Sequence, residues 1–209
     1  MPLSTYFNLF LLTITFAFGS HIAYKYIIAA STKKKVQKEI HEVIMFSYND
    51  RGLKRSKYSR CSITQSMERL LYYLNTPKYT MDICMYVLTN LDLTNAVMKM
   101  RLKGVKIRII VDADMAYSSG SNIRKLEKHG IPVRWMKSTN LMHHKFILID
   151  ASSEQEFATP LVMMGSLNWT NQALNGNWED VAVTSQQELV RQYKEEFEKL
   201  WVAFKPIVD

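Results

Sequence analysis

From residue 79 onward, the sequence alternates between apolar runs that suit buried strands and amphipathic stretches that suit helices. The strand-like runs are residues 79–88, 105–112 and 131–136, and the helical patterns between them are residues 93–103 and 122–129. Gly104 and Gly130 end the two helical patterns, as glycines often do. Strands that alternate with helices favour an α/β layered domain.

The last third of the chain departs from this alternation. Three more strand-like runs follow without long helices between them, at residues 145–150, 161–164 and 180–184. Such short connections favour antiparallel pairing, and the polar segment 151–160 indicates a hairpin loop. An amphipathic helix over residues 187–204 ends the pattern. We therefore expect an α/β fold with a central mixed β-sheet flanked by helices.

The region before residue 79 predicts one strand, one loop and one helix. Residues 42–47 form a strand-like run, and residues 49–60 predict a basic loop. An amphipathic helix follows, with Ser62 as its expected N-cap and Pro77 just beyond its end.

The first 24 residues contain no Asp, Glu, Lys or Arg and are mostly apolar. About 20 such residues suffice to cross a bilayer as a helix. A cleaved secretory signal is the alternative, but it needs basic residues before the apolar run, and here they follow it, beginning with Lys25. We expect an N-terminal transmembrane helix with its juxtamembrane start in residues 1–32 and one domain in residues 33–209. The positive-inside rule places that domain in the cytosol.

The charge balance and the cysteines narrow the choice of partners and compartment. The chain carries 27 Lys and Arg against 19 Asp and Glu, a formal net charge of +8. A basic protein of this size favours contact with nucleic acid or an anionic membrane, although a merely solvated basic surface is the alternative. The two cysteines, Cys61 and Cys84, build no disulfide framework, which fits a reducing compartment.

The segment from Met142 to Asp150 has the form His-x-Lys-x-x-x-x-Asp. Side chains at i and i+2 of a strand share a face, so His143 and Lys145 can point into one site where the strand begins. Asp150 has the opposite parity, and the sequence does not show how it would join that site.

A second polar segment follows the apolar run 161–164, where Gly165 permits a tight turn. Its side chains and those just before the next strand add a hydroxyl, an amide and a carboxylate, from Ser166, Asn168 and Glu179. Together with an imidazole and an ammonium group, this set suits attack on a phosphodiester, whose transition state carries charge on nonbridging oxygens.

These residues resemble the signature of the phospholipase D superfamily, which is His-x-Lys-x4-Asp followed by Gly-Ser-x-Asn. From its N-terminal segment to its final helix, the chain more narrowly resembles the single-motif mitochondrial members, the Zucchini or mitochondrial phospholipase D family. This resemblance implies that residues 33–209 form a phospholipase-D-like catalytic domain.

The resemblance also implies a role for each residue of the site. His143 would attack phosphorus and form a phosphohistidine intermediate. Lys145 and Asn168 would hold phosphate oxygens, with Ser166 assisting. Glu179 would hydrogen-bond the imidazole of a His143.

Asp150 would complete the catalytic signature, again by resemblance alone, and no metal or other cofactor would take part in the phosphoryl chemistry. Members of the family carry a Cys/His zinc-binding segment between the first strand and the first helix, where this chain has only Cys61. Cys84 lies in a predicted strand, and His41 precedes the first one. Because structural zinc needs four nitrogen or sulfur ligands, we do not expect a complete zinc site.

A single motif predicts a shared active site. One imidazole must attack while another protonates the leaving oxygen, and His143 cannot do both in one step. His144 is one residue out of phase and is expected to point away. The simplest solution is a two-fold homodimer with both His143 side chains at its axis.

Two substrates are open, single-stranded RNA cut to leave a 5′-phosphate and an anionic phospholipid such as cardiolipin. The basic loop favours RNA because its cations suit a phosphate backbone, and the residues concerned are Arg51, Lys54, Arg55, Lys57 and Arg60. Only Leu141 and Met142 offer an apolar lip for lipid. A catalytically dead scaffold is a third class, against which the intact motif argues.

By resemblance, RNA cleavage implies piRNA biogenesis at the mitochondrial outer membrane, with Piwi-class proteins as partners.

Overall fold

The computed structural model describes residues 3–31, 39–155 and 158–206. Its contacts divide the chain into two units, Met1–Lys38 and Glu39–Asp209. The first holds helix α1, Leu3–Ser31, and the second holds every other helix and strand that is described. Within the described residues, no helix combines the length and the hydropathy needed to cross a membrane, so the predicted transmembrane helix is not confirmed.

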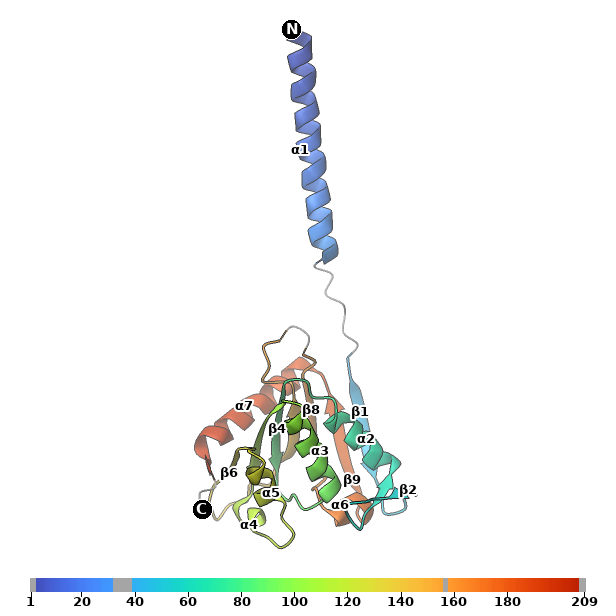
Figure 1. Ribbon diagram of the computed structural model, residues 1–209, viewed down its shortest axis with the longest axis vertical. Helices are drawn as coiled ribbons and strands as arrows, with labels where there is room; N and C mark the ends of the chain where they lie inside the picture. Colours follow the sequence, from blue (N-terminus) through green and yellow to red (C-terminus); the bar gives the residue numbers. More distant parts are fainter. Residues whose placement is uncertain (1–2, 32–38, 156–157, 207–209) are drawn as a thin grey trace. The chain divides into compact units, whose positions relative to one another are not determined.

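The second unit is built on one mixed sheet, as the sequence predicts (Figure 1). Eight strands of the described residues lie in the order β1-β9-β8-β7-β4-β5-β6-β10. Their bounds are β1 His41–Phe46, β4 Thr80–Met85, β5 Lys106–Val111, β6 Val133–Trp135, β7 Lys145–Ile149, β8 Leu161–Gly165, β9 Glu179–Thr184 and β10 Lys205–Pro206. Strands β4, β5 and β6 pair in parallel, and all other pairs in this sheet are antiparallel.

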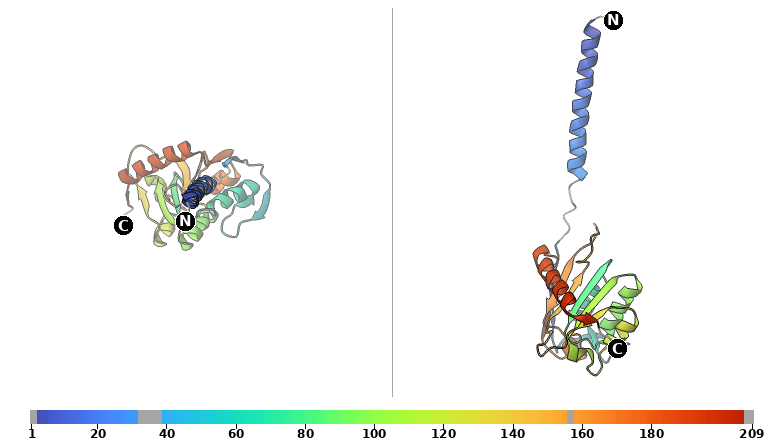
Figure 2. Two further views of the ribbon diagram at one scale, coloured as in Figure 1. Left: turned by 90° about the horizontal axis from the view of Figure 1, so that it is seen from above. Right: turned by 90° about the vertical axis from the view of Figure 1, so that its left-hand side faces the viewer.

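Helices cover both faces of the sheet, as the view along its edge shows (Figure 2). One face carries the helices α2 Gln65–Leu74, α3 Leu91–Leu102, α5 Ile123–Lys128 and α6 Asn171–Asn175, whose buried side chains share one core cluster. The other face carries α7, Gln187–Ala203, whose Val190 and Phe197 pack on Phe146 and Leu148 of β7. Strand β7 is therefore buried from both sides, as its apolar run predicts.

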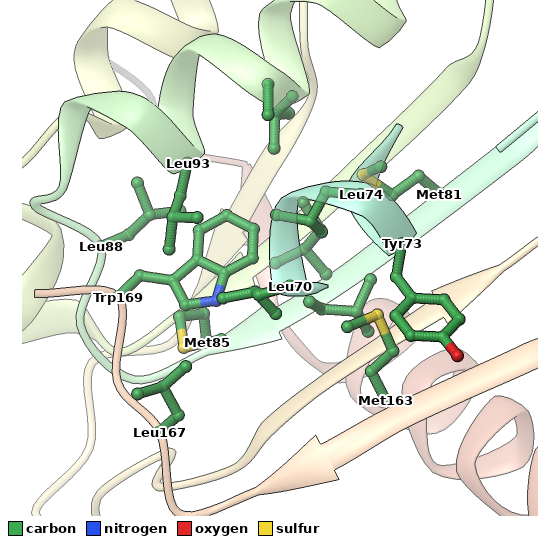
Figure 3. Packing of buried hydrophobic residues seen from close by; sticks show 14 of the residues in the cluster. Leu70, Tyr73, Leu74, Met81, Met85, Leu88, Leu93, Met163, Leu167 and Trp169 are labelled. Carbon is green, nitrogen blue, oxygen red and sulfur yellow. The ribbon is translucent and has the colours of Figure 1, made fainter. Parts of the chain in front are cut away.

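The larger core fixes the position of the second polar segment. Trp169 is 1% exposed and lies among side chains of α2, α3 and β4, including Leu70, Leu93 and Met85 (Figure 3). Its backbone N–H donates to the carbonyl of Val87 at 3.0 Å. The turn after β8 is thereby tied to the segment that follows β4.

The region around the predicted basic loop differs from the sequence expectation. Residues Gly52–Arg55 form strand β2, which pairs with strand β3, Ser62–Thr64. The N-cap of α2 is accordingly Thr64, whose hydroxyl accepts a hydrogen bond from the Met67 N–H, and not Ser62. The sequence did not predict this hairpin, because β2 lies in a run of charged residues and neither strand alternates clearly between apolar and polar residues.

The predicted hairpin loop between β7 and β8 is confirmed by their antiparallel register, with Ile149 opposite Leu161. Its residues 156–157 lie outside the described residues. One short helix that the sequence did not predict, α4 over Ala113–Ala116, follows β5.

Candidate active site

Register places the start of β7 beside the end of β4. Lys145 lies opposite Met85, and the segment before it is anchored at Met142. The Met142 N–H donates to the carboxylate of Asp112 at 3.0 Å, and its sulfur contacts the Cys84 thiol. Met142 is buried while His143 is exposed, so this anchor presents the imidazole at the end of the sheet.

His143 and Lys145 form a compact pair with Tyr86. The Lys145 Nζ donates to the His143 carbonyl oxygen at 2.9 Å and lies 3.3 Å from each imidazole nitrogen. The Tyr86 ring lies 4.7 Å from the imidazole between centroids, and the Lys145 Nζ lies 5.3 Å from the centre of the Tyr86 ring. The structure thus brings the imidazole and the ammonium group together, as the sequence predicts.

The surroundings of Lys145 shift the pKa of its ammonium group. Partial burial lowers the pKa of the ammonium group below its ordinary value, and the nearby Glu179 carboxylate acts in the opposite direction. Because this ammonium group has lost part of its hydration, an anionic ligand such as a phosphate would stabilise its charged form.

The second polar segment supplies a hydrogen-bonded carboxylate. The Ser166 hydroxyl donates to Glu179 at 2.5 Å and accepts the Asp180 N–H at 3.1 Å. The Asn177 amide donates to the other Glu179 oxygen at 2.9 Å. Because a Cβ at Gly165 would collide with the Asp180 carbonyl oxygen, only glycine allows this close approach of β8 and β9.

Asn168 leaves a polar atom without a partner. Its Oδ1 is buried and makes no hydrogen bond within the described part of the chain. Buried polar groups are nearly always paired, so this oxygen is an exception in the turn that follows β8, the strand that pairs with β7.

The two neighbouring histidines diverge, as the sequence predicts. His143 contacts Tyr86, whereas the His144 ring contacts Phe146 and its Nε2 lies 3.7 Å from Glu196 of α7. His144 therefore lies on the face of the sheet that α7 covers, away from the candidate site. Glu179 bonds to Ser166 and Asn177 within its own chain rather than to His143.

Asp150 is not brought to this site. It directly follows the last residue of β7, is 3% exposed and has a φ of 52°. Its carboxylate accepts hydrogen bonds from the backbone N–H groups of Lys78, Tyr79 and Thr80 at 2.8–3.2 Å. Asp150 thus joins the end of β7 to the start of β4.

The basic segment begins where β1 ends, close to the candidate site. In the register of β1 and β9, Phe46 lies opposite Glu179. Lys54 pairs with Glu68, and the other four cations predicted for RNA binding are exposed, namely Arg51, Arg55, Lys57 and Arg60. The hydroxyls of Ser56 and Ser59 both donate to Asp92 at the start of α3, which fixes the middle of the segment.

The two cysteines do not fit a zinc site. Burial raises the pKa of Cys61 to about 11 and raises that of Cys84 further. The two thiols lie in different core clusters, on opposite faces of the sheet, so they cannot bind one zinc ion together. No group of three or more His, Cys, Asp or Glu side chains in the described ranges is arranged to hold a metal ion.

Comparison with known proteins identifies the family. The model for "Cardiolipin synthase, PLD-like domain" matches residues 70–201, a span that contains both polar segments. The chain belongs to the phospholipase D superfamily. Within it, the chain is a member of the Zucchini or mitochondrial cardiolipin hydrolase family, to which its relatives belong.

Three relatives named mitochondrial cardiolipin hydrolase illustrate the range. The Chlamydomonas reinhardtii protein is 40% identical over 74% of this chain and 66% of its own length. The Drosophila melanogaster protein is 30% identical over 92% of this chain and 87% of its own length. The Homo sapiens protein is 36% identical over 68% of this chain, and the match spans only 53% of the human protein.

Solved structures agree on the phospholipase-D-like fold. The phospholipase D family member Nuc from Salmonella typhimurium has a TM-score of 0.64 and 19% identity over 82% of this chain and 100% of its own. NucT from Helicobacter pylori has a TM-score of 0.66 and 19% identity over 81% of this chain and 100% of its own. As a member of the phospholipase D superfamily, the chain is a phosphodiesterase.

Two residues of the site were missed by sequence reasoning. Tyr86 directly follows β4 and Asp112 directly follows β5, so both lie at the carboxyl ends of parallel strands. Polar and aromatic residues at such ends commonly serve ligand sites, and this was the signal that could have found them.

Proposed function

We propose that this phosphodiesterase cleaves single-stranded RNA endonucleolytically, without a metal, and leaves 5′-phosphate ends. The observation that carries this proposal is the exposed basic segment, residues 51–60, which follows β1 by four residues; the last residue of β1, Phe46, lies opposite Glu179. A backbone of phosphates that tracks those cations can reach the imidazole of His143.

In the proposed reaction, His143 attacks the phosphorus of the scissile phosphodiester. A nitrogen–phosphorus bond forms, the bond from phosphorus to the 3′-oxygen breaks, and a second imidazole gives that oxygen its proton. The second imidazole, now neutral, then takes a proton from water, which attacks the phosphorus. The nitrogen–phosphorus bond breaks, the strand with a 5′-phosphate is released, and both imidazoles return to their starting states. Lys145 and Asn168 hold the nonbridging oxygens, where charge develops.

The remaining residues support these groups. Ser166 and Asn177 hold the Glu179 carboxylate, which orients an imidazole when the second subunit is present. Asp150 acts as a positioning residue, because it contacts the backbone at the far end of β7 and not the reacting atoms.

The second imidazole comes from a second copy of the chain. Within the second unit, His144 faces α7, His41 lies opposite Thr184 at the far end of β1 and β9, and His129 caps the end of α5. A two-fold homodimer that brings two His143 side chains together completes the site. In mixtures with wild-type protein, His143→Asn subunits should therefore form inactive heterodimers.

We propose that the protein is attached to the mitochondrial outer membrane through residues 1–32, with residues 33–209 in the cytosol. The relatives' names support a mitochondrial location, and the apolar composition of the N-terminal segment supports the attachment. The described α1 exposes apolar side chains such as Phe10, Leu12 and Phe16, which suits contact with lipid. There it would process piRNA precursors beside Piwi-class proteins.

Cardiolipin hydrolysis to phosphatidic acid is the second candidate function, favoured by the names of the relatives. One experiment separates the two. Full-length protein in nanodiscs is incubated with labelled single-stranded RNA and, separately, with cardiolipin in the nanodisc bilayer, both with chelator. RNA cleavage that vanishes in His143→Asn supports the first proposal. Release of phosphatidic acid without RNA cleavage would contradict it.

A further inference from the structure

Two exposed aromatic side chains lie at the end of the sheet that carries the candidate site. Tyr48 is 57% exposed and Trp178 is 70% exposed, and their rings meet edge to face with centroids 5.5 Å apart. Tyr48 lies two residues beyond β1, and Trp178 directly precedes Glu179 of β9. The two antiparallel neighbours β1 and β9 therefore present both rings at the end of the sheet where His143 lies.

This exposure contrasts with the other tryptophans of the second unit. Trp169 is 1% exposed in the core, and Trp135 and Trp201 are half-buried. A tryptophan that stays largely in water does not gain the free energy of burying its large apolar surface. Trp178 keeps this exposure despite its edge-to-face contact with Tyr48, so most of its surface is open to a ligand.

An open groove of about 450 Å³ is lined by Trp178 and by Met45, Asp50 and Glu179 among others. The Asp50 carboxylate accepts from the Ser66 hydroxyl, and Glu179 accepts from Ser166, so both acids are held in place. An apolar wall with acidic groups repels phosphate. The same surface suits a nucleobase, whose ring can stack and whose amino groups can donate to carboxylates.

Exposed cations follow Asp50, a residue that lines the groove, in the chain. The exposed cations Arg51 and Arg55 begin three residues after Tyr48 and attract the phosphates that a base leaves outside the groove. Aromatic rings interleaved with cations are the usual arrangement of a surface that binds single-stranded nucleic acid.

We propose that Tyr48 and Trp178 form a stacking platform for a nucleobase next to the scissile phosphate. The inference rests on the proposed RNA substrate and deepens it, because the platform would set which unpaired nucleotide enters the site. An intact duplex could not use it, since its bases are already stacked.

The test measures binding apart from cleavage. All variants are made in full-length His143→Asn protein, and binding is measured to a single-stranded RNA and to an abasic strand of equal length and charge. Trp178→Ala and Tyr48→Ala remove a ring, and Trp178→Phe and Tyr48→Phe retain one. Leu102→Ala is the matched control, because this exposed apolar residue ends α3 at the opposite end of the sheet.

The platform predicts that each alanine variant binds RNA about tenfold more weakly, whereas the phenylalanine variants and Leu102→Ala bind within twofold of the parent. Binding to the abasic strand should be unchanged in all of them. RNA, but not the abasic strand, should also quench the fluorescence of Trp178, the most exposed tryptophan.

Equal losses on the RNA and the abasic strand would overturn the inference, and so would no loss on either. Loss of dimerisation in Trp178→Ala would instead make the pair an interface between two copies. Weaker binding of cardiolipin vesicles without an effect on RNA would make it a lipid contact. Ring-dependent RNA binding by a protein whose wild type cuts no RNA would retain the platform and reject the proposed nuclease.

Discussion

The two ends of β7 carry residues of one motif but differ in almost every physical respect. At its start, His143 is exposed, Lys145 is half-buried, and the two contact each other and Tyr86. At its end, Asp150 is 3% exposed and accepts hydrogen bonds from three consecutive backbone N–H groups. The groups at the start of β7 can still bind a ligand, whereas the carboxylate at its end is already occupied by backbone N–H groups.

This difference teaches that one sequence signature can contain two kinds of constraint. The groups at the start of β7, an imidazole and an ammonium group in contact, are those that we propose act on the phosphodiester. The carboxylate at its end joins β7 to the start of β4, whose carboxyl end bears Tyr86. Asp150 thus acts on the site through the relative placement of two strands. Substitutions at the two ends should separate activity from stability.

The largest effect is expected from His143→Asn. Removal of the nucleophile should lower kcat by about 10⁴-fold or more, because no covalent intermediate can form. The melting temperature should stay within about 2 °C of wild type, since the exposed imidazole contributes little packing. Kinetics and calorimetry on the same preparation check both values. A large loss of stability would show that the start of β7 also carries the fold.

Lys145 should give the next largest effect and a diagnostic pH profile. Lys145→Ala should lower kcat/KM by about 10²- to 10³-fold, as expected for a lost phosphate-binding cation.

Because burial lowers the pKa of the Lys145 ammonium group, the alkaline limb of kcat/KM should fall at a lower pH than an ordinary lysine would give. In Lys145→Arg the limb should move to higher pH, since a guanidinium group stays protonated. An unmoved limb in this variant would assign the limb to another group.

Asp150→Asn should lower stability more than activity, which is the opposite of what His143→Asn should do. Asparagine tolerates the positive φ of this position but loses the charge that the three N–H groups share. We expect a loss of about 3 kcal/mol in the free energy of unfolding, roughly 10 °C in melting temperature. At temperatures where the variant stays folded, its kcat should remain within about tenfold of wild type. Loss of activity in a protein of unchanged stability would place Asp150 in the chemistry.

The smallest effect is expected at Tyr86. Tyr86→Phe keeps the ring that contacts His143 and should retain activity within about twofold, whereas Tyr86→Ala should lose about tenfold in kcat. Steady-state kinetics on the two variants distinguish support by the ring from a role of the hydroxyl. A greater loss in Tyr86→Phe than in Tyr86→Ala would contradict support by the ring.

The sheet and most helices could be predicted from the sequence because apolar periodicity reports burial directly. The mixed sheet, the hairpin after β7 and the divergence of His143 and His144 all follow from it. The hairpin of β2 and β3 was missed because β2 lies in a run of basic residues and both strands are short, and the N-cap was misplaced by two residues as a consequence.

The candidate site could be predicted only where its residues are close in sequence. His143 and Lys145 are two residues apart, so strand parity was enough to pair them. Tyr86 and Asp112 reach the site through strand register, which links positions that are distant in the chain. The partners of Asp150 are backbone N–H groups about 70 residues away, and no pattern of side chains reports them.

Covalent trapping tests the division of β7 most directly. Single-stranded RNA labelled at its 3′ end is mixed with wild-type, His143→Asn and Asp150→Asn proteins, quenched in neutral detergent, and examined for a labelled protein band. Wild type and folded Asp150→Asn should form an adduct that mass spectrometry maps to His143, and His143→Asn should form none. An adduct in His143→Asn, or none in a folded Asp150→Asn protein, would contradict the division of chemistry and structure between the two ends.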